Sequence, residues 1–539
     1  MSFHFLSNIF FQTSGAAGVT NKPLTFTGDD FLRVLPEFIV LVMATLIVIV
    51  DLLLPTNRRQ LLSWLALLGY AGAMAASLYL FSSQHYPDNA NSSFSGMFIR
   101  DDFTTFFEFI FLITGFLSVL LSPKYVIKED MPIGEFLAIQ AYCVLGMMVV
   151  GGSGDLMAIF VGIELTSISV YMLTGFARND RGSAEGAVKY FLLGILATAI
   201  LVYGMAWAFG MTGSTNLGDI RNAISANNLS QDTGLTFAML LLIVGFSFKI
   251  AAVPFHVWTP DAYEGAPTPI TAFMSVGPKA AGFAALIRVL VQGMPQLANQ
   301  WSIIIAVLAV LTMTFGNIVA IPQRSLKRML AYSSIAHTGY LLVGLAAVFK
   351  PGAAGGIDSE ALSTVLIYML IYVFMNLGAF GILIWIQNLG GGPNVEDMNG
   401  LSTWAAAPAL AMAICMLSLA GIPPLGGFFG KFFVFRSAVS NGLTWLAIIG
   451  VLNSAVSAFF YLRVIVAMYM NPLAENVRQR VVVTSEKRGG RAAPFLTAAM
   501  VVVIIAIFVL GIVPDFALGA ARTGANLFIT TVKAATGTP

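Results

Sequence analysis

A small set of ionisable side chains lies inside long apolar stretches of this 539-residue sequence. They are Glu108, Glu164, Lys189, Lys249, Lys279, His337 and Lys431. A charge at the centre of a bilayer costs from about 2.5 to well over 10 kcal/mol, so such residues face protein or water and usually serve a function. Carboxylate, amine and imidazole groups share one reaction, the gain and loss of a proton. The set therefore predicts a path for protons, provided that the apolar stretches cross a membrane.

The deeper a charged residue lies in its apolar stretch, the less plausible a purely structural role becomes relative to proton transfer. Glu164, in FVGIELTSISV, and Lys279, in SVGPKAAGF, lie well inside their stretches, far from either membrane surface. Lys249 lies nearer one end, and snorkelling of its long side chain to the surface is the alternative. Lys189 and Glu108 lie only a few residues from the ends of their stretches, so a structural role stays open for both.

His337 stands in YSSIAHTGY, well inside another apolar stretch. A lone histidine is often a packed polar residue, but an imidazole can pass a proton near neutral pH. Ser333, Ser334 and Thr338 lie beside it and could order water. We therefore predict that His337 belongs to the relay.

The composition is typical of a polytopic membrane protein. Hydrophobic residues make up 58% of the chain and charged residues only 10%, against about a quarter charged in a soluble domain. The net charge of +2 gives no sign of nucleic-acid binding. Cys143 and Cys415 lie in apolar runs without a CxxC or a Cys/His cluster, so we expect no disulfide scaffold, iron–sulfur cluster or metal site. GxGxxG, P-loop and HExxH motifs are also missing from the sequence.

Fourteen apolar runs approach the length of about 20 residues that crosses a hydrocarbon core. They fall near 35–54, 61–81, 103–122, 133–151, 155–176, 185–210, 234–254, 268–293, 301–321, 328–348, 362–387, 405–436, 443–470 and 494–514. The predicted fold is an all-α polytopic membrane protein of about 14 helices, with no soluble domain. The residues before the first run lack a basic flank and a cleavage site, so we interpret them as an extension and not as a signal peptide.

Lysine and arginine collect in alternate loops, which predicts the orientation of the chain. The segments after odd-numbered spans hold Arg58, Arg59, Lys124, Lys128, Arg178, Arg181, Arg324, Lys327, Arg328, Arg478, Arg480, Lys487, Arg488 and Arg491. Those after even-numbered spans hold few, namely Arg100, Arg221, Lys350 and Arg436. We expect the odd-following loops to be cytoplasmic and both termini to lie outside.

Two predicted spans contain helix breakers beside a lysine. The seventh reads FKIAAVPFHVWTP, with the break after Lys249, and the twelfth reads LAGIPPLGGFFGKF, with the break before Lys431. Backbone groups freed by such breaks are tolerated in lipid only inside protein or beside a water-filled cavity. Because the two spans are five apart, they run in opposite directions. This pattern is typical of an inverted-repeat transporter with its ion path at the breaks.

These features divide the chain into five parts. They are an N-terminal extension at 1–34, transmembrane helices 1–3 at 35–132, a first five-helix repeat at 133–293, an inverted second repeat at 294–470, and a cytoplasmic loop, fourteenth helix and C-terminal tail at 471–539. A carboxylate that approaches or leaves a buried lysine changes whether that lysine holds its proton. Movement of Glu164 relative to Lys249 is therefore the pump step that we predict.

The stretch KIAAVPFHVWTPDAYEGAPTPITAFMSVGPKAAGF, at 249–283, resembles the antiporter-like membrane subunits of respiratory complex I, and specifically the NADH-quinone oxidoreductase subunit N family. VKYFLLG at 188–194, YSSIAHTGY at 332–340 and GIPPLGGFFGKF at 421–432 agree with it. The resemblance covers roughly 35–515. It implies a proton-translocating subunit without a cofactor of its own, whose flavin, iron–sulfur clusters and quinone belong to partner subunits.

The resemblance also implies particular residues. The family's relay positions match Glu164 in the fifth span, Lys189 in the sixth, Lys249 in the seventh, Lys279 in the eighth and Lys431 in the twelfth. The M-type subunit has glutamate at the last position, so Lys431 favours the N-type. The L-type subunit continues into a long lateral helix, for which this sequence ends too early.

The implied partners are the M-type antiporter-like subunit, the small membrane subunits and the lateral helix of the L-type subunit, together with the lipid bilayer and protons. Fourteen spans match the bacterial and plant-type form, so we expect the bacterial inner membrane, with a thylakoid or other organelle membrane as the alternative. A subunit of a multisubunit cation/proton antiporter is the alternative function. A scaffold whose polar residues only hold helices together is a more distant one.

Overall fold

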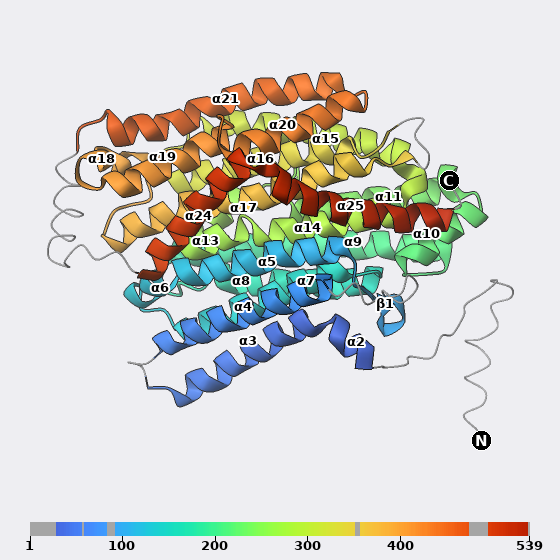
Figure 1. Cartoon of the computed structure of the whole chain (residues 1–539), viewed down its shortest axis with the longest axis horizontal. Helices are drawn as coiled ribbons and strands as arrows, with labels where there is room; N and C mark the ends of the chain where they lie inside the picture. The colour runs from blue at the N-terminus through green and yellow to red at the C-terminus, as the bar shows by residue number, and fades with distance from the viewer. Residues whose placement is uncertain (1–27, 56–58, 83–91, 351–355, 474–493, 537–539) are drawn as a thin grey trace.

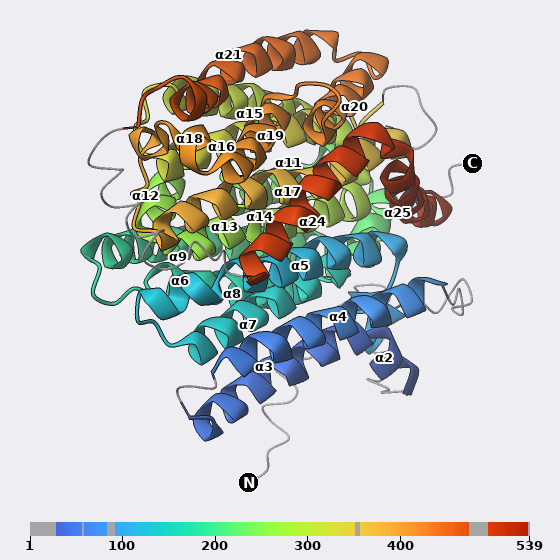
Figure 2. The same cartoon turned by 60° about the vertical axis from the view of Figure 1, so that its left-hand side comes forward.

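The computed structural model describes residues 28–55, 59–82, 92–350, 356–473 and 494–536, and 83% of them are helical. Long helices lie side by side along one axis (Figure 1) and form a thick bundle (Figure 2). The uninterrupted crossings are α3 (Leu35–Leu53), α4 (Gln60–Ser82), α5 (Asp102–Leu121), α7 (Ile133–Gly152), α8 (Leu156–Thr174), α9 (Arg181–Thr212), α15 (Ala298–Ala320), α16 (Leu326–Ala346), α17 (Ser359–Asn388), α21 (Thr444–Tyr469) and α24 (Pro494–Ile512).

Three further crossings are built from shorter pieces. They are α11 (Thr233–Lys249) with α12 (Trp258–Gly265), α13 (Thr268–Met274) with α14 (Gly277–Ile287) and the π-helix η4 (Arg288–Gly293), and α19 (Ala406–Ala420) with α20 (Gly426–Ser440). The all-α membrane fold and the breaks beside Lys249 and Lys431 are therefore confirmed. Twelve described segments are long and apolar enough to cross a membrane, and α11 and α19 are shorter apolar helices. The inverted relation between the two halves stays a prediction.

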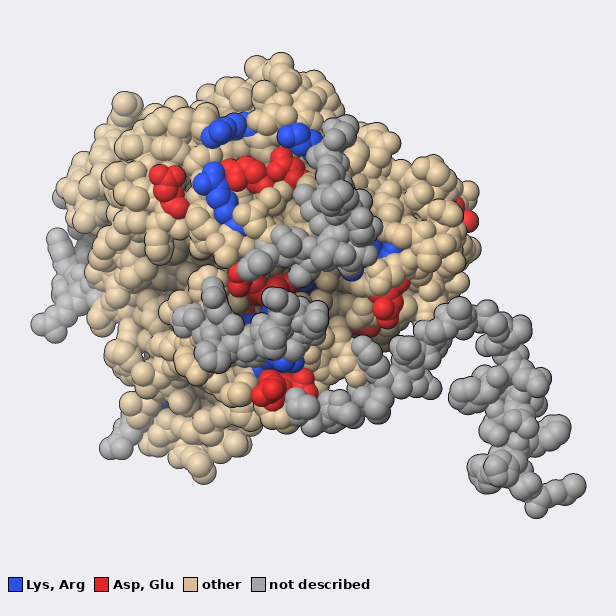
Figure 3. All heavy atoms as spheres, turned by 45° about the vertical axis from the view of Figure 1, so that its right-hand side comes forward, with Lys and Arg blue, Asp and Glu red and all other residues tan. Residues whose placement is uncertain are grey.

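The connections gather at the two ends of the bundle. Segments that follow odd-numbered crossings, such as α6 (Pro123–Lys128) and α18 (Leu401–Trp404), lie at one end, whereas the hairpin β1–β2 (Ser92–Ser93 and Phe98–Ile99) and α10 (Leu217–Ala226) lie at the other (Figure 1). Figure 3, turned to bring this second end forward, shows most of the visible charged side chains in several groups over the middle of the surface, with a few near its edges. The remaining short elements are α2 (Gly28–Arg33), η2 (Phe94–Gly96), η3 (Leu229–Gln231), η5 (Pro295–Leu297) and η7 (Val395–Met398).

The polar helix α16 lies at the centre of the bundle. In the most apolar 18-residue stretch of α16, 94% of the residues are buried, against 33% in that of the peripheral helix α3. Serine, threonine and histidine side chains in α16 need partners that lipid does not offer, and a central position provides them. The core of the protein is thus built around the helix that carries His337.

Two features of the structure are not predicted by the sequence pattern. The eighth crossing stops at Met274 and starts again at Gly277, just ahead of Pro278. The segment after the last crossing, expected to be a tail, forms the helix α25 (Pro514–Thr536). This helix packs against α5 and α17, with Phe528 stacked on Phe103 at 4.5 Å between ring centres. Residues 1–27 of the predicted extension at 1–34 and most of the loop at 471–493 lie outside the described residues, and the end of the extension forms α2.

The close approach of α20 to the end of α19 leads to a first prediction. Gly427 N–H donates to Ser418 Oγ at 3.1 Å, and a methyl group on Gly427 would overlap the Ser418 carbonyl oxygen. Gly427→Ala should therefore destabilise the protein by about 1–3 kcal/mol, the usual cost of overpacking. Gly210→Ala in α9 is the control, because no atom of the part of the chain that the structure describes lies within 4 Å of the added carbon. Thermal unfolding of the detergent-solubilised protein measures both, and equal melting temperatures would contradict the prediction.

Candidate functional site

The site begins with an ion pair between α8 and the end of α11. Lys249 Nζ lies 3.8 Å from Glu164 Oε1. It donates hydrogen bonds to Ser167 Oγ at 2.8 Å and to Thr198 Oγ1 at 3.4 Å. Thr198 Oγ1 in turn donates to Glu164 Oε1 at 2.8 Å. The Ser167 and Thr198 hydroxyl groups are therefore closer to Lys249 Nζ than the Glu164 carboxylate is. At 3.8 Å, the ammonium and carboxylate groups attract each other without a direct hydrogen bond.

Lys249 ends α11 because the backbone cannot continue as a helix. Ala251 has a φ of 59°, and Pro254 lacks an N–H group. Side chains from other helices satisfy the freed backbone groups. Val253 N–H donates to Thr312 Oγ1 at 3.0 Å, Thr338 Oγ1 donates to the Ile250 carbonyl at 2.9 Å, and Trp258 Nε1 donates to the Phe248 carbonyl at 3.0 Å. The break is thus completed inside protein, as the membrane requires.

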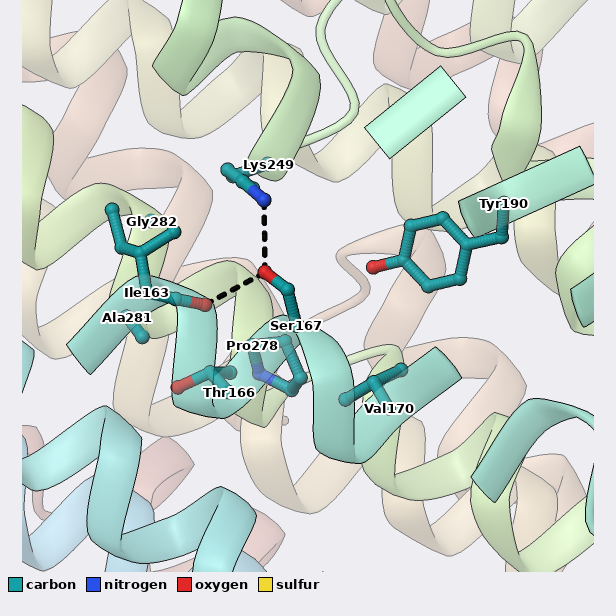
Figure 4. A pocket seen from close by; sticks show the side chains of 9 residues that line it. All are labelled: Ile163, Thr166, Ser167, Val170, Tyr190, Lys249, Pro278, Ala281 and Gly282. Atoms are coloured by element: carbon teal, nitrogen blue, oxygen red, sulfur yellow. Dashed lines mark hydrogen bonds between the residues drawn. The ribbon is translucent and has the colours of Figure 1, made fainter. Parts of the chain in front are cut away.

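A small cavity lies beside the amine of Lys249 (Figure 4). Its volume of about 20 Å³ is room for about one water molecule. Ser167 meets Lys249 across it, and the Tyr190 hydroxyl turns toward the same space (Figure 4). Pro278 and Gly282 of α14 form another wall. Because Gly282 follows Lys279 by three residues, both belong to one face of α14, which therefore joins the surroundings of Lys249 to those of Lys279.

Lys279 is the third residue of α14, directly after the interruption of the eighth crossing. It is 4% exposed, and its Nζ donates to Ser334 Oγ of α16. The Tyr263 ring centre lies 5.7 Å from the same nitrogen, and Tyr263 Oη lies 3.4 Å from Ser334 Oγ. Ser334 thus connects the central lysine to α16.

His337 follows Ser334 by three residues on α16 and is fully enclosed. Its Nδ1 lies 2.7 Å from Tyr368 Oη of α17, and its Nε2 lies 3.1 Å from Tyr461 Oη of α21. Tyr461 Oη also forms a hydrogen bond with Ser333 Oγ. Both ring nitrogens therefore have direct protein partners.

Lys431 lies in α20, just after the second predicted break, and its amine reaches back to the end of α19. Its Nζ donates to the carbonyls of Leu419 at 2.9 Å and Ala420 at 3.0 Å, and to Ser454 Oγ at 2.9 Å. The last carbonyls of a helix have no helical partner and carry its negative dipole end, so the end of α19 suits an ammonium group. Tyr340, three residues after His337, places its ring centre 4.9 Å from the same nitrogen. We call Glu164, Lys249, Lys279, His337 and Lys431 the central row.

Two of the sequence-predicted residues lie outside the central row. Lys189 is nearly half exposed and pairs with Glu185 at 2.7 Å and Asp261 at 2.9 Å, so its relay role stays a prediction. Glu108 is fully buried and pairs with Arg100 at 2.6 Å, next to a second pair of Arg100 with Glu37 at 3.1 Å.

The structure also buries charged residues that the sequence-based set of ionisable residues does not include, among them Arg288 and Lys327. Arg288, within the predicted span 268–293, is fully buried and pairs with Asp101 at 2.9 Å. Lys327, expected in a loop, is the second residue of α16 and donates to the carbonyls of Glu264 at 2.7 Å and Ala266 at 2.6 Å. The position of Arg288 inside an apolar run can be seen in the sequence. The burial of Lys327 cannot, because it depends on the packing of the end of α12 against α16.

The hydroxyl groups around the row were missed for the same reason. Ser167, Thr198, Tyr368, Tyr461 and Ser454 come from four different helices, and nothing in their local sequence marks them. Ser333, Ser334 and Thr338 were expected to order water beside His337; in the structure they bind Tyr461, Lys279 and the Ile250 carbonyl.

A polar hollow of about 630 Å³ opens at the end of the bundle where the odd-following connections gather. Acidic residues outnumber basic ones in its wall, which includes Glu129, Asp130, Asp180, Glu264, Arg178 and Lys327. Lys327 is buried and belongs to the same helix as Ser334 and His337. The hollow therefore reaches the first turn of α16 at the bundle end.

A helical membrane bundle with interrupted crossings and ionisable groups buried at the interruptions defines an ion-translocating membrane protein. The family model of the NADH:quinone oxidoreductase/Mrp antiporter transmembrane region matches residues 153–457. The NADH-quinone oxidoreductase subunit N of Trichlorobacter lovleyi is 46% identical over 81% of this chain and 87% of its own length. The chain belongs to this family of antiporter-like membrane subunits, as a member of the subunit N group.

Solved structures agree with this assignment. A chain of respiratory complex I from Thermus thermophilus, solved with bound aureothin, is 30% identical with a TM-score of 0.73, over 91% of this chain and 100% of that one. A chain of the Mrp complex from Dietzia has a TM-score of 0.78 over 95% of this chain and 99% of that one. At 18% identity, the Mrp chain shows the shared fold alone.

The buried cluster around Arg100 leads to a second prediction. Arg100→Met should leave the Glu37 and Glu108 carboxyl groups without their guanidinium partner, and removal of one member of a buried pair costs about 3–5 kcal/mol. Arg522→Met is the control, because its pair with Glu360 is exposed and such pairs contribute at most about 1 kcal/mol. Thermal unfolding should show a large loss for the first variant only. A similar, small loss in both would disprove a stabilising role for the cluster.

Proposed function

We propose that this chain is a proton-translocating membrane subunit of an NADH-quinone oxidoreductase. The observation that carries the proposal is the central row, in which ionisable groups at three interrupted crossings are connected through neighbouring faces of α14 and α16. The names of relatives such as the Trichlorobacter lovleyi chain support the coupling to NADH and quinone. Electron transfer itself belongs to partner subunits, where we expect flavin, iron–sulfur clusters and quinone.

The Glu164–Lys249 pair is suited to control the first transfer. The two charged groups are 3.8 Å apart, and Thr198 contacts both. A shift of α8 relative to α11 would change this distance, and with it the Coulomb interaction that keeps the proton on Lys249. In the proposed cycle, redox energy released in partner subunits drives this shift.

The other two amines of the row have different surroundings. Among the described residues, no carboxylate lies within ion-pair distance of Lys279 or Lys431. The three acceptors around Lys431 match the three N–H bonds of an ammonium group, whereas Lys279 has one side-chain acceptor, Ser334. We infer from these contacts that Lys431 is held in place more firmly than Lys279, and that Lys279 is the point where a proton is passed on.

Protons would enter through the polar hollow, which lies on the side predicted to be cytoplasmic, and leave on the other side. The proposed setting is the bacterial inner membrane, with both termini outside. The proposed neighbours are the M-type subunit, the small membrane subunits and the lateral helix of the L-type subunit. The similarity to a chain of the multisubunit complex I supports a place in such an assembly.

A subunit of a cation/proton antiporter is the second candidate, supported by the shared fold of the Mrp chain. Purification of the chain from its native membrane separates the two. Co-purification with NADH:quinone oxidoreductase activity supports the first function, and cation/proton exchange without that activity supports the second.

A third prediction concerns Lys279. Lys279→Ala should allow assembly but lower proton pumping and coupled quinone reduction by roughly 10-fold or more, as expected for loss of a proton-transfer group. Lys279→Arg should fail as well, because a guanidinium group does not release its proton. Measurement of NADH-driven acidification in membrane vesicles checks both variants. A normal proton-to-electron ratio in Lys279→Ala would rule out the central role of this lysine.

A fourth prediction separates a relay from a fixed cation at Lys431. Lys431→Arg keeps donors for the Leu419 and Ala420 carbonyls, whereas Lys431→Ala leaves those carbonyls without a side-chain donor. We expect the arginine variant to be more stable than the alanine variant, and both to pump poorly. Native gels and vesicle acidification report the two properties. Pumping restored by arginine would show that Lys431 acts only as a fixed charge.

A further inference from the structure

The two ring nitrogens of His337 are held by tyrosines from two different helices. Tyr368 of α17 faces Nδ1 at 2.7 Å, and Tyr461 of α21 faces Nε2 at 3.1 Å. Tyr461 continues the hydrogen-bonded chain to Ser333. Four groups, Tyr368, His337, Tyr461 and Ser333, thus form one line of hydrogen bonds inside the protein.

This line admits two orientations. A neutral imidazole has one N–H donor and one nitrogen acceptor. In the first orientation Tyr368 donates to Nδ1, Nε2–H donates to Tyr461, and Tyr461 donates to Ser333. In the second every donor and acceptor is exchanged, so that Ser333 donates to Tyr461, Tyr461 donates to Nε2, and Nδ1–H donates to Tyr368. Both orientations use the same three contacts.

We infer that Tyr368 and Tyr461 are proton-carrying residues, and that a proton crosses His337 by exchange of its tautomer between these two hydroxyl groups. The inference rests on the proposed function and adds two residues to it. The geometry that carries it is the placement of one buried hydroxyl on each ring nitrogen.

The step balances without a charged intermediate on the ring. A water molecule gives a proton to Tyr368 Oη while the original Tyr368 proton moves to Nδ1. The Nε2 proton moves to Tyr461 Oη, the Tyr461 proton moves to Ser333 Oγ, and a second water molecule takes the Ser333 proton. One proton has entered and one has left, all four groups are again neutral, and His337 has changed from the Nε2–H to the Nδ1–H tautomer.

The charges near His337 favour this route over a doubly protonated ring. Lys279 and Lys431 are the cations that act on it, and they are linked to α16 through Ser334 and Tyr340, three residues to either side of His337. An imidazolium would add a third positive charge between them. Among the described residues, no carboxylate lies within ion-pair distance of the ring to offset it.

The test replaces single hydroxyl groups while the rings stay in place. Tyr368→Phe and Tyr461→Phe, introduced into the assembled complex, should each lower NADH-driven proton pumping by roughly 10-fold. They should also change the effect of D₂O on turnover, a readout that a packing role would leave unaltered. Tyr70→Phe is the matched control, because Tyr70 is equally buried and its hydroxyl has no hydrogen-bond partner among the described residues. Its pumping should match that of the unmodified complex.

His337→Gln gives a second test. A glutamine amide can donate at one atom and accept at another, but it cannot exchange these roles, so the variant should assemble and still pump poorly. Normal pumping in His337→Gln, or in both tyrosine variants, would overturn the inference. If those variants pump normally while Lys279→Ala does not, only the tautomer step is wrong. If Lys279→Ala also pumps normally, the proposed function fails with it.

Discussion

Hydrocarbon offers no hydrogen-bond partner to a backbone that stops being a helix, and this constraint governs the architecture of the site. At the first break, side chains of α12, α15 and α16 satisfy the peptide groups around Ile250 and Val253. At the second, the amine of Lys431 satisfies the end of α19. The helices that complete the breaks must therefore pack around them, and the lysines are brought together in the protein interior as a result.

Much of the fold follows from local sequence, because apolar length and helix breakers are properties of short segments. The fourteen crossings and the breaks beside Lys249 and Lys431 are of this kind. The interruption before Gly277 and the helix α25 are not, since both depend on packing against other helices. The inverted repeat, the orientation and the five-part division stay predictions.

The ionisable residues of the site can also be predicted from local sequence, whereas their partners cannot. The placement of Glu164, Lys249, Lys279, His337 and Lys431 inside apolar runs is visible in the sequence. The structure buries the last four, leaves the Glu164 side chain 27% exposed, and brings Glu164 and Lys249 together. Their hydroxyl partners are not visible, because Thr198 and Tyr461 reach the row only through tertiary packing. A scaffold role explains these hydrogen bonds less well than a relay does, since a buried lysine that serves only packing is more costly than an apolar residue of similar size.

The burial of α16 limits which substitutions the protein can accept. Twenty of its 21 residues are buried, all except Arg328. Most membrane helices have a lipid-facing side on which one apolar residue replaces another at little cost. Here each side adjoins another helix, a lysine or a tyrosine. Random mutagenesis of the gene should therefore recover almost no tolerated changes between Met329 and Ala346, whereas α3 should accept many.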